Sequence, residues 1–259
     1  FAAMALTLYL LTASSFSAYT YFSLMPYLKK MDATKNYVNL GCTYSSEYEQ
    51  NEKKFQKFVA PVFNKLWDEL DKRGALFLDA ENDKKEGLQA EGADIDDEYL
   101  KKQAFRGKYA YINKNMFEYS KILDENGKLL NIPTVKENEW HILVPSNIKV
   151  NSWEKKLIKE DHAFFCKGKK RPFKEVYHTI KSNQSLLSFD ARKRIEEPSI
   201  VNYVLYVVNG KGFSDVYGKK ISSLINGNMH PRVNNADKAY EELKPIIKRT
   251  NAERYVSSL

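Results

Sequence analysis

The longest apolar segment of the chain comes at its beginning, where Phe1–Leu28 contains no Asp, Glu, Lys or Arg. All 41 basic and all 33 acidic residues follow it. A helix of this length reaches about 42 Å, which exceeds the roughly 30 Å hydrocarbon thickness of a bilayer. Tyr27 and two earlier tyrosines suit the membrane interface, and Lys29 and Lys30 end the segment. Residues 1–30 are therefore predicted to form a transmembrane anchor.

Two other interpretations of this segment stay open. A secretory signal has an apolar core of about 7 to 15 residues and then a small-residue cleavage site, whereas this run is longer and has no clear site. The second interpretation is a buried core helix, because seven Ser or Thr residues in the first 23 positions make the segment less apolar than a leucine-rich span. Because the chain begins at Phe1 rather than Met, we expect further residues before it, and the orientation of the anchor stays open.

Residues 46–74 carry the clearest helical pattern. Ser46 followed by Glu49 is a capping-box signature, and Gly74 is a typical helix stop. Between them, apolar residues recur at the spacing of one helix face, at Phe55, Phe58, Val59, Val62, Phe63, Leu66, Trp67 and Leu70. We predict one helix, bent at Pro61 because proline lacks a backbone donor. Its predicted core residues are Phe58, Phe63, Leu66 and Trp67.

Several shorter runs have the pattern of strands. They are apolar or alternate between apolar and polar residues, and lie at 35–44, 75–78, 108–113, 139–144, 162–166, 176–180 and 199–208. Asn126-Gly127 between two apolar runs also predicts a hairpin over Ile122–Leu130. Strands are therefore expected to outnumber helices in the middle of the chain.

Two further helices and one long loop complete the pattern. Either residue of Asn151–Ser152 can cap a short helix, and the spacing after Asn235 predicts a C-terminal helix that continues towards Tyr255. Residues 79–98 hold nine acids and two lysines with few large apolar side chains, so we expect an acidic mobile loop there. Together with the strands, these elements predict an α+β fold for residues 31–259.

Composition narrows the class of protein. With 259 residues, 43% of them hydrophobic and 13% aromatic, the chain can form a substantial core, which excludes global disorder. The net charge is +8, but Arg makes up a small minority of the 41 basic residues. Nucleic-acid-binding proteins rely more on Arg than this chain does. We therefore expect no nucleic-acid partner, and the lipid bilayer as the partner of the predicted anchor.

The sequence contains no recognisable catalytic or cofactor-binding motif. It lacks a GxSxG elbow, a Walker A loop and a GxGxxG turn. None of its histidines forms an HxxxH zinc pair; they are His141, His162, His178 and His230. We therefore expect no enzyme activity, no catalytic residue, no metal and no cofactor.

Two features are candidate sites of another kind. The first is a basic stretch made of Lys167, Lys169, Lys170, Arg171 and Lys174. It can contact anionic lipid headgroups or an anionic wall polymer, and a solvated loop is the alternative. The second is a candidate disulfide between Cys42 and Cys166, which lie outside any CxxC motif. The sequence leaves the state of these two cysteines open.

Three segments carry a resemblance to a known family. They are GKYAYINKNMFEYSKILDENGKLL at Gly107–Leu130, EWHILVPSNIK at Glu139–Lys149 and RIEEPSIVNYVLYV at Arg194–Val207. In their order along the chain, they resemble the bacteriocin-associated integral membrane proteins of Gram-positive bacteria, which are permease-like subunits of ABC transporters. The resemblance covers roughly residues 35–255, and the apolar segment stands where that family has its first transmembrane helix.

The resemblance implies a mixed α and β extracytoplasmic domain between a first transmembrane helix and a C-terminal helix that returns to the membrane. It also implies a separate cytoplasmic ATP-binding subunit, a peptide substrate linked to bacteriocin export or immunity, and a location in the cell membrane with the main domain extracytoplasmic. The family supplies no catalytic residues. The chain departs from the pattern in one respect, because no second apolar run appears before Leu259.

Two other functions stand as alternatives. A membrane-anchored surface binding or adhesion protein needs the apolar segment and the domain but no transporter core. A surface hydrolase would use scattered acids such as Asp190, Glu196 and Glu197, although their spacing selects no catalytic pair. A non-enzymatic domain of a permease-like membrane protein is therefore the main expectation.

Overall fold

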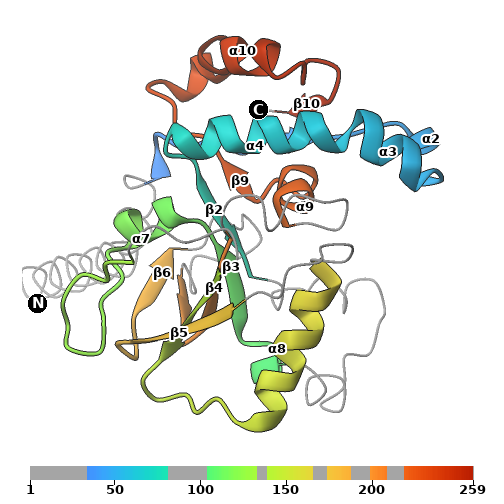
Figure 1. Cartoon of the computed structure of the whole chain (residues 1–259). Helices are drawn as coiled ribbons and strands as arrows, with labels where there is room; N and C mark the ends of the chain where they lie inside the picture. Colours follow the sequence, from blue (N-terminus) through green and yellow to red (C-terminus); the bar gives the residue numbers. More distant parts are fainter. Residues whose placement is uncertain are drawn as a thin grey trace, which may run out of the picture.

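The computed structural model describes residues 34–80, 104–132, 139–165, 174–187, 199–208 and 219–258. The anchor predicted over residues 1–30 lies outside these ranges. Within them, no helix is both long enough and apolar enough to cross a membrane. The described residues form a mixed α and β structure, which confirms the predicted fold class for this part of the chain (Figure 1).

Helices and strands are interspersed along the described chain. The helices are α2 (Ser46–Glu49), α3 (Glu52–Phe58), α4 (Ala60–Lys72), α7 (Lys114–Ser120), α8 (Ser152–Phe165), α9 (Lys219–Ile225) and α10 (Ala239–Arg249), with short 3-10 helices η2 (Ala104–Gly107) and η4 (Ala236–Lys238). The strands are β1 (Gly41–Cys42), β2 (Leu76–Asp79), β3 (Tyr109–Ile112), β4 (Glu139–Pro145), β5 (Lys174–Ile180), β6 (Ser185–Leu187), β7 (Ser199–Val201), β8 (Val204–Val207), β9 (Met229–His230) and β10 (Val256–Ser258).

Six of the described strands form one mixed sheet in the order β5-β4-β8-β3-β2-β9. β4 runs parallel to β5 and β3 runs parallel to β8, while the other neighbours are antiparallel. Parallel neighbours need a long crossover connection, and α8 lies on the one that joins β4 to β5 (Figure 1). β1 pairs with β10 and β6 pairs with β7 as separate antiparallel ribbons.

The central strands are buried on both faces of this sheet. In β3, Tyr109 and Tyr111 belong to one apolar cluster, whereas Ala110 and Ile112 belong to another. β8 alternates in the same way. Because successive side chains of a strand point to opposite faces, each face needs its own cover. This is why these strands appear in the sequence as nearly continuous apolar runs.

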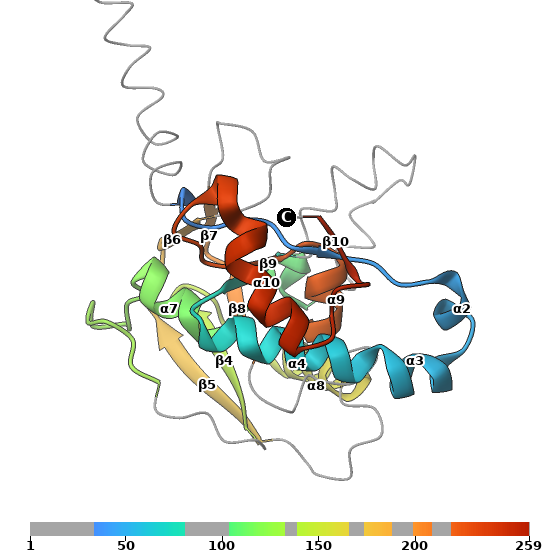
Figure 2. The same ribbon diagram turned by 90° about the horizontal axis from the view of Figure 1, so that it is seen from above.

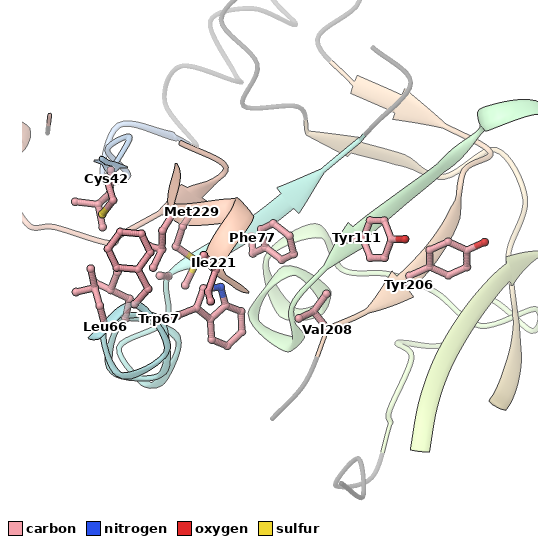
Figure 3. Close-up of a cluster of buried hydrophobic side chains, with 14 of the residues drawn as sticks. Cys42, Leu66, Trp67, Phe77, Tyr111, Tyr206, Val208, Ile221 and Met229 are labelled. Carbon is pink, nitrogen blue, oxygen red and sulfur yellow. The ribbon is translucent and has the colours of Figure 1, made fainter. Parts of the chain in front are cut away.

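The larger cluster lies between the sheet and α4, α8, α9 and α10. Trp67 of α4 is 1% exposed, and its indole N–H donates to Ser223 Oγ at 3.1 Å. Its ring meets that of Phe77 edge-on, with 6.5 Å between centroids. Figure 3 shows Trp67 on the side of α4 that faces β2 and α9. The predicted core positions Phe63, Leu66 and Trp67 are therefore confirmed.

The opposite face of the sheet is covered by α7, the hairpin after it, and β6. Met116 of α7 and Leu186 of β6 are buried in this smaller cluster. In the hairpin, Leu123 pairs with Leu129, and Gly127 has φ +78°. A tight turn of this kind needs the left-handed conformation that glycine adopts freely. The hairpin predicted from the Asn-Gly pair is confirmed.

The first helical segment is divided into α2, α3 and α4 instead of forming one bent helix. Pro61 stands in the first turn of α4, where its missing N–H removes no hydrogen bond, so it begins a helix rather than bending one. The break at Val59 shifts the phase of the apolar face. Phe58 is 44% exposed while Val59 is buried, so the prediction that Phe58 belongs to the core is wrong. Ser45, one residue before the predicted cap, occupies the N-cap of α2.

α4 ends where Gly74 predicts an end. Gly74 has φ +84°, and its N–H donates to Asp71 O while the Ala75 N–H donates to Leu70 O, both at 3.0 Å. These are the two hydrogen bonds of a Schellman motif, which satisfies carbonyls at the end of a helix. Because β2 begins at Leu76, this motif turns the chain directly from α4 into the sheet.

The C-terminal segment ends in a strand rather than in a continuing helix. α10 ends at Arg249, and Asn251 then adopts φ +59°, a left-handed conformation that does not continue a helix. Val256–Ser258 forms β10 and pairs with β1. Tyr255 is 3% exposed and packs edge-on against Phe63, with 5.3 Å between ring centroids. The prediction that this helix continues towards Tyr255 is therefore wrong.

Three strand predictions also need correction. Residues 199–208 form two strands instead of one, because Asn202 between β7 and β8 adopts φ +57°. Residues 162–165, predicted as a strand, continue α8 instead. Of the strand expected over 35–44, Gly41–Cys42 forms β1, and an isolated bridge lies nearer its start. In the first case, the backbone conformation of a single residue sets the strand ends. In the third case, the available pairing partners set them. The apolar pattern shows neither of these causes.

The acidic loop was predicted to begin at Asp79. Asp79 is instead the last residue of β2 and is 8% exposed. The strand includes it because it pairs with Tyr111 of β3. The rest of the predicted loop, apart from Ala80, lies outside the described residues.

Trp67→Ala should lower the free energy of unfolding by about 3 to 5 kcal/mol, because it removes a buried ring from a packed core. Chemical denaturation of the full chain measures this change. Phe58→Ala is the matched control on the neighbouring helix, and should cost about 1 kcal/mol or less because Phe58 is 44% exposed. Equal losses for the two variants would contradict the assignment of Trp67 to the core.

Candidate functional site

Two histidines from neighbouring strands meet at the β4–β5 edge of the sheet. His141 Nδ1 lies 2.8 Å from His178 Nε2, and the rings stack with centroids 4.9 Å apart and 17° between planes. The parallel register pairs Leu143 with His178 and His141 with Val176, which places the two histidines diagonally on one face. That face is the side of the smaller cluster, since Leu143 belongs to it.

Glu139 lies on the same strand face, two residues before His141. One of its carboxylate oxygens is 3.5 Å from His141 Nε2. This distance allows electrostatic attraction but is too long for a good hydrogen bond, in agreement with Nε2 being buried without a hydrogen-bond partner. Burial lowers the pKa of His141, and Glu139 acts in the opposite direction. Burial also lowers the pKa of His178, with a smaller effect of the same sign from His141.

The two imidazoles share one N–H across their 2.8 Å contact. If His141 donates through Nδ1, its Nε2 carries a lone pair towards Glu139. If His178 donates through Nε2, then His141 carries an N–H at Nε2 and points it at the carboxylate. The first arrangement presents a metal ligand or a proton acceptor, and the second a chain of donors that ends at a carboxylate. The cluster can therefore take part in proton transfer or in metal binding.

An ion pair between a buried lysine and a half-exposed aspartate links α9 to α4. Lys220 is 1% exposed, its ammonium group pairs with Asp68, and it lies 4.6 Å from the centre of the Trp67 ring. Ser223 Oγ donates to the Lys220 carbonyl at 2.8 Å. Because the lysine is enclosed and its charge is matched by a carboxylate, we interpret this cluster as a structural connection between the two helices.

A second polar cluster joins the ends of α4, β2 and β3. Asn113 is completely buried, and its Oδ1 accepts from the Phe77 N–H at 3.1 Å. Its Nδ2 donates to Ala75 O and to Asp71 Oδ1, both at 2.7 Å. Burial raises the pKa of Asp71, and the hydrogen bond from Asn113 opposes that rise. Every polar atom of the Asn113 side chain has a protein partner, which indicates a structural role.

The residues predicted as an anionic-surface contact are described in one case. Lys174 is exposed at the start of β5. The other four, Lys167, Lys169, Lys170 and Arg171, lie outside the described residues. The predicted contact with an anionic surface stays a prediction.

The candidate disulfide is described at one of its two ends. Cys42 is buried and bonded to no other described cysteine, and burial raises the pKa of its thiol to about 12. Cys166 lies outside the described residues. The pairing of the two cysteines therefore stays a prediction.

Metal binding by three side chains finds no support in the described ranges, where no three His, Cys, Asp or Glu residues are placed to hold one ion. At the β4–β5 edge the reason is geometric. Glu139 and His178 approach opposite nitrogens of His141, so one ion cannot contact all three residues.

A small pocket lies between the sheet and the hairpin, next to Ile122 and Pro145. Its free volume of about 10 Å³ is near the least that one water molecule occupies. Gln184 on its wall is already used, because its amide donates to Leu123 O and Lys181 O and accepts from the Leu123 N–H. This pocket is therefore too small to bind an organic ligand, and the amide of Gln184 on its wall already has its hydrogen-bond partners.

Comparison of the chain with protein-family models, with curated proteins and with solved structures finds no match in any of the three. The arguments for function therefore rest on the residues themselves. Sequence spacing gave no indication of the histidine cluster, because His141 and His178 are far apart in sequence and parallel strand pairing brings them together.

His230 is a separate buried histidine on β9. It is 4% exposed, its Nδ1 lies 2.8 Å from Asn39 Oδ1, and burial lowers its pKa to about 3. Because an amide oxygen only accepts, His230 donates through Nδ1 in this contact. The folded protein therefore holds His230 neutral at a pH where the unfolded chain, with an ordinary pKa near 6.5, takes up a proton.

We predict that His230 makes the protein less stable in mild acid. Its contribution is complete above pH 6.5 and is lost as the pH falls towards 3, by about 1.4 kcal/mol per pH unit once well below 6.5. Urea unfolding of the full chain at pH 7 and pH 5 measures the slope. His230→Asn keeps an N–H donor near Asn39 but cannot titrate, so its slope should be flatter by about one proton. Identical slopes would contradict the buried neutral assignment.

Proposed function

We propose that the chain forms the extracytoplasmic α+β domain of a permease-like membrane protein, linked to bacteriocin or peptide export or immunity. The observation that carries the proposal is the absence of charge over Phe1–Leu28, whereas every charged residue of the chain, beginning with Lys29 and Lys30, follows this segment. In this proposal the apolar segment anchors the domain in the cell membrane, and a separate cytoplasmic subunit binds and hydrolyses ATP. The domain itself is not an enzyme, and it contacts a peptide substrate.

The segments that resemble the family provide the first support. The first of them contains β3, α7 and the hairpin, the second contains β4, and the third contains β7 and β8. β3, β4 and β8 are the adjacent inner strands of the sheet. The resemblance therefore concerns the core of the domain, which determines architecture, rather than loops.

The pairing of β1 with β10 provides the second support. Cys42 pairs with Val256, and the Thr43 N–H donates to Tyr255 O at 2.7 Å. The strand that follows the predicted anchor therefore lies beside the last described strand. A domain between two membrane segments needs its two ends to approach each other, and this ribbon suits that requirement.

α10 is firmly attached to α4, which supports transmission of movement through the domain. Lys65 Nζ donates to Arg249 O at 2.9 Å, and Arg73 Nη1 donates to Glu242 O at 3.2 Å. Arg249 also pairs with Glu69. Figure 2 shows α10 lying across α4. Packed helices move as one body, so a displacement applied at the C-terminal segment would reach the sheet through α4.

The exposed face of α8 suits a position near anionic headgroups. Trp153 is 43% exposed, and Lys155, Lys156 and Lys159 are also exposed on α8. At about 100° per residue, Lys156 is the lysine nearest to Trp153 around the helix, whereas Lys155 lies on the opposite side from it. Lys156 lies 3.8 Å from Glu160, which reduces the local positive charge. Exposed tryptophan and lysine residues occur together on helices at a membrane interface, so α8 suits a membrane location but does not select a transporter.

A membrane-anchored binding or adhesion protein is the alternative, because the anchor and the ribbon suit it equally well. The reading frame beyond Leu259 distinguishes the two functions. Further apolar spans, together with co-purification of an ATP-binding subunit with the full-length protein, would support the permease. A stop codon directly after Leu259 would favour the anchored binding protein.

The full chain should remain with the membrane pellet after alkaline extraction. Leu10→Arg combined with Leu11→Arg should release it, because a charge at the centre of a spanning helix costs about 2.5 to 3.5 kcal/mol. Leu129→Arg is the control, since it adds a charge at a side chain that is 66% exposed on the domain. Extraction of the unaltered chain as a soluble monomer would contradict the anchor.

The reaction rate of the Cys42 thiol should show whether β10 protects β1 in the β1–β10 ribbon. In a Cys166→Ser background, Cys42 should react slowly with an uncharged thiol reagent, because it is 1% exposed and burial raises its pKa to about 12. Deleting residues 256–259 should speed the reaction about tenfold or more, equivalent to about 1.4 kcal/mol of lost protection. Glu253→Ala, outside the strand, is the control. An unchanged rate after the deletion would show that β10 does not hold β1.

A further inference from the structure

Glu139 and His141 form an arrangement that the proposed membrane function does not use. They lie two residues apart on β4, so their side chains share one face of the strand, and a Glu139 oxygen lies 3.5 Å from His141 Nε2. We propose that this pair binds one Zn²⁺ ion, with His178 as a positioning residue behind His141. The proposal does not depend on the membrane assignment.

The separation of the two ligand atoms suits a tetrahedral ion. Zinc lies about 2.0 to 2.1 Å from histidine nitrogen and from carboxylate oxygen. If an ion lies at those distances from two atoms that are 3.5 Å apart, the ligand–metal–ligand angle is about 117°. This angle is close to the tetrahedral value of about 109°. The gap is thus too wide for a good hydrogen bond but has the width of a zinc chelate.

The burial of His141 adds to this geometric argument. His141 is 4% exposed, and its buried Nε2 makes no hydrogen bond of normal length, since the Glu139 carboxylate that attracts it is 3.5 Å away. Buried polar atoms in folded proteins nearly always have a close partner. An ion between Nε2 and the carboxylate would give both of them a close contact. Glu139 has a side chain 17% exposed to solvent, so the ion can enter by way of the carboxylate.

His178 supports the ligand from the other side. Its Nε2 lies 2.8 Å from His141 Nδ1 and can accept the proton there. That hydrogen bond places the lone pair of His141 on Nε2, where the ion binds, and fixes the plane of the ring. Histidine ligands of metal ions almost always donate their other N–H to such a partner.

The site has two protein ligands, so water would complete the coordination. This makes it weaker and more exchangeable than a structural zinc site, which usually has four protein ligands. Lys174 on β5 is the register neighbour of Glu139 on β4, and its side chain is exposed. Its positive charge opposes cation binding, but solvent and salt screen an exposed charge. A carboxylate and a neutral imidazole favour zinc over Mg²⁺ or Ca²⁺, which prefer oxygen ligands alone.

The test is metal titration of the full chain after chelator treatment. Zn²⁺ binding is followed by calorimetry, and Co²⁺ serves as a probe whose visible absorption reports tetrahedral coordination. We expect one ion per chain. His178→Gln should weaken binding about 10- to 100-fold, as changes in the partners of metal ligands usually do. Glu139→Gln should weaken it at least as much, and His141→Gln should abolish it.

Glu160→Gln is the control, because it removes an exposed carboxylate outside the site, on α8. Its binding should equal that of the unaltered chain. If His141→Gln fails to fold, Glu139→Gln decides, since that change is small and partly exposed. No binding by the unaltered chain, or binding that Glu139→Gln leaves unchanged, would overturn the proposal. An ion held by other residues would give the second of these results.

Discussion

The central strands of the sheet are apolar on both faces, and the positions of the other elements follow from the need to cover them. Tyr111 and Tyr206 face one cluster while Ile112 and Val207 face the other. α4, α8, α9 and α10 enclose the first face, and α7 with the hairpin encloses the second. The cover is thinnest at β5, the last strand of the sheet, whose residues before Ile180 are half-buried or exposed. Glu139 and His178 are only partly buried at this edge, where burial does not exclude polar side chains, and they contact the buried His141.

Local signals predicted a large part of the described fold. Gly74 ends α4 by its backbone conformation, the Asn-Gly pair forms a hairpin, and β3, β4 and β5 lie within one or two residues of their predicted bounds. The failures share a cause. Phe58 is exposed because a helix break changes the phase of the apolar face, and Asn202 divides a strand by adopting a left-handed conformation. Neither the break nor this choice of backbone conformation is visible in hydrophobic spacing.

Prediction of the histidine cluster requires information about strand pairing, which a search for local motifs does not contain. An HxxxH search finds ligands on one helix, whereas His141 and His178 come from parallel strands joined through α8. Two strand patterns separated by a helical one could have predicted the parallel pairing. The register, which decides whether the two rings meet, follows from packing of the whole sheet. The proximity of Glu139 and His141 was easier to predict from the sequence, since alternate residues of one strand share a face.

The histidine cluster and the β1–β10 ribbon lie on different sides of the sheet. Cys42 of β1 and Tyr255, directly before β10, pack in the larger cluster, while His141 shares its strand face with Leu143 of the smaller one. β8, β3 and β2 separate β4 from β9. Coupling between distant sites needs an element with two arrangements, and the buried centre of this sheet has well-packed aromatic rings on Tyr111 and Tyr206, 5.2 Å apart. Transmission of an ion-binding signal from the histidine cluster to the β1–β10 ribbon would therefore require movement of the domain as one body rather than rearrangement inside it.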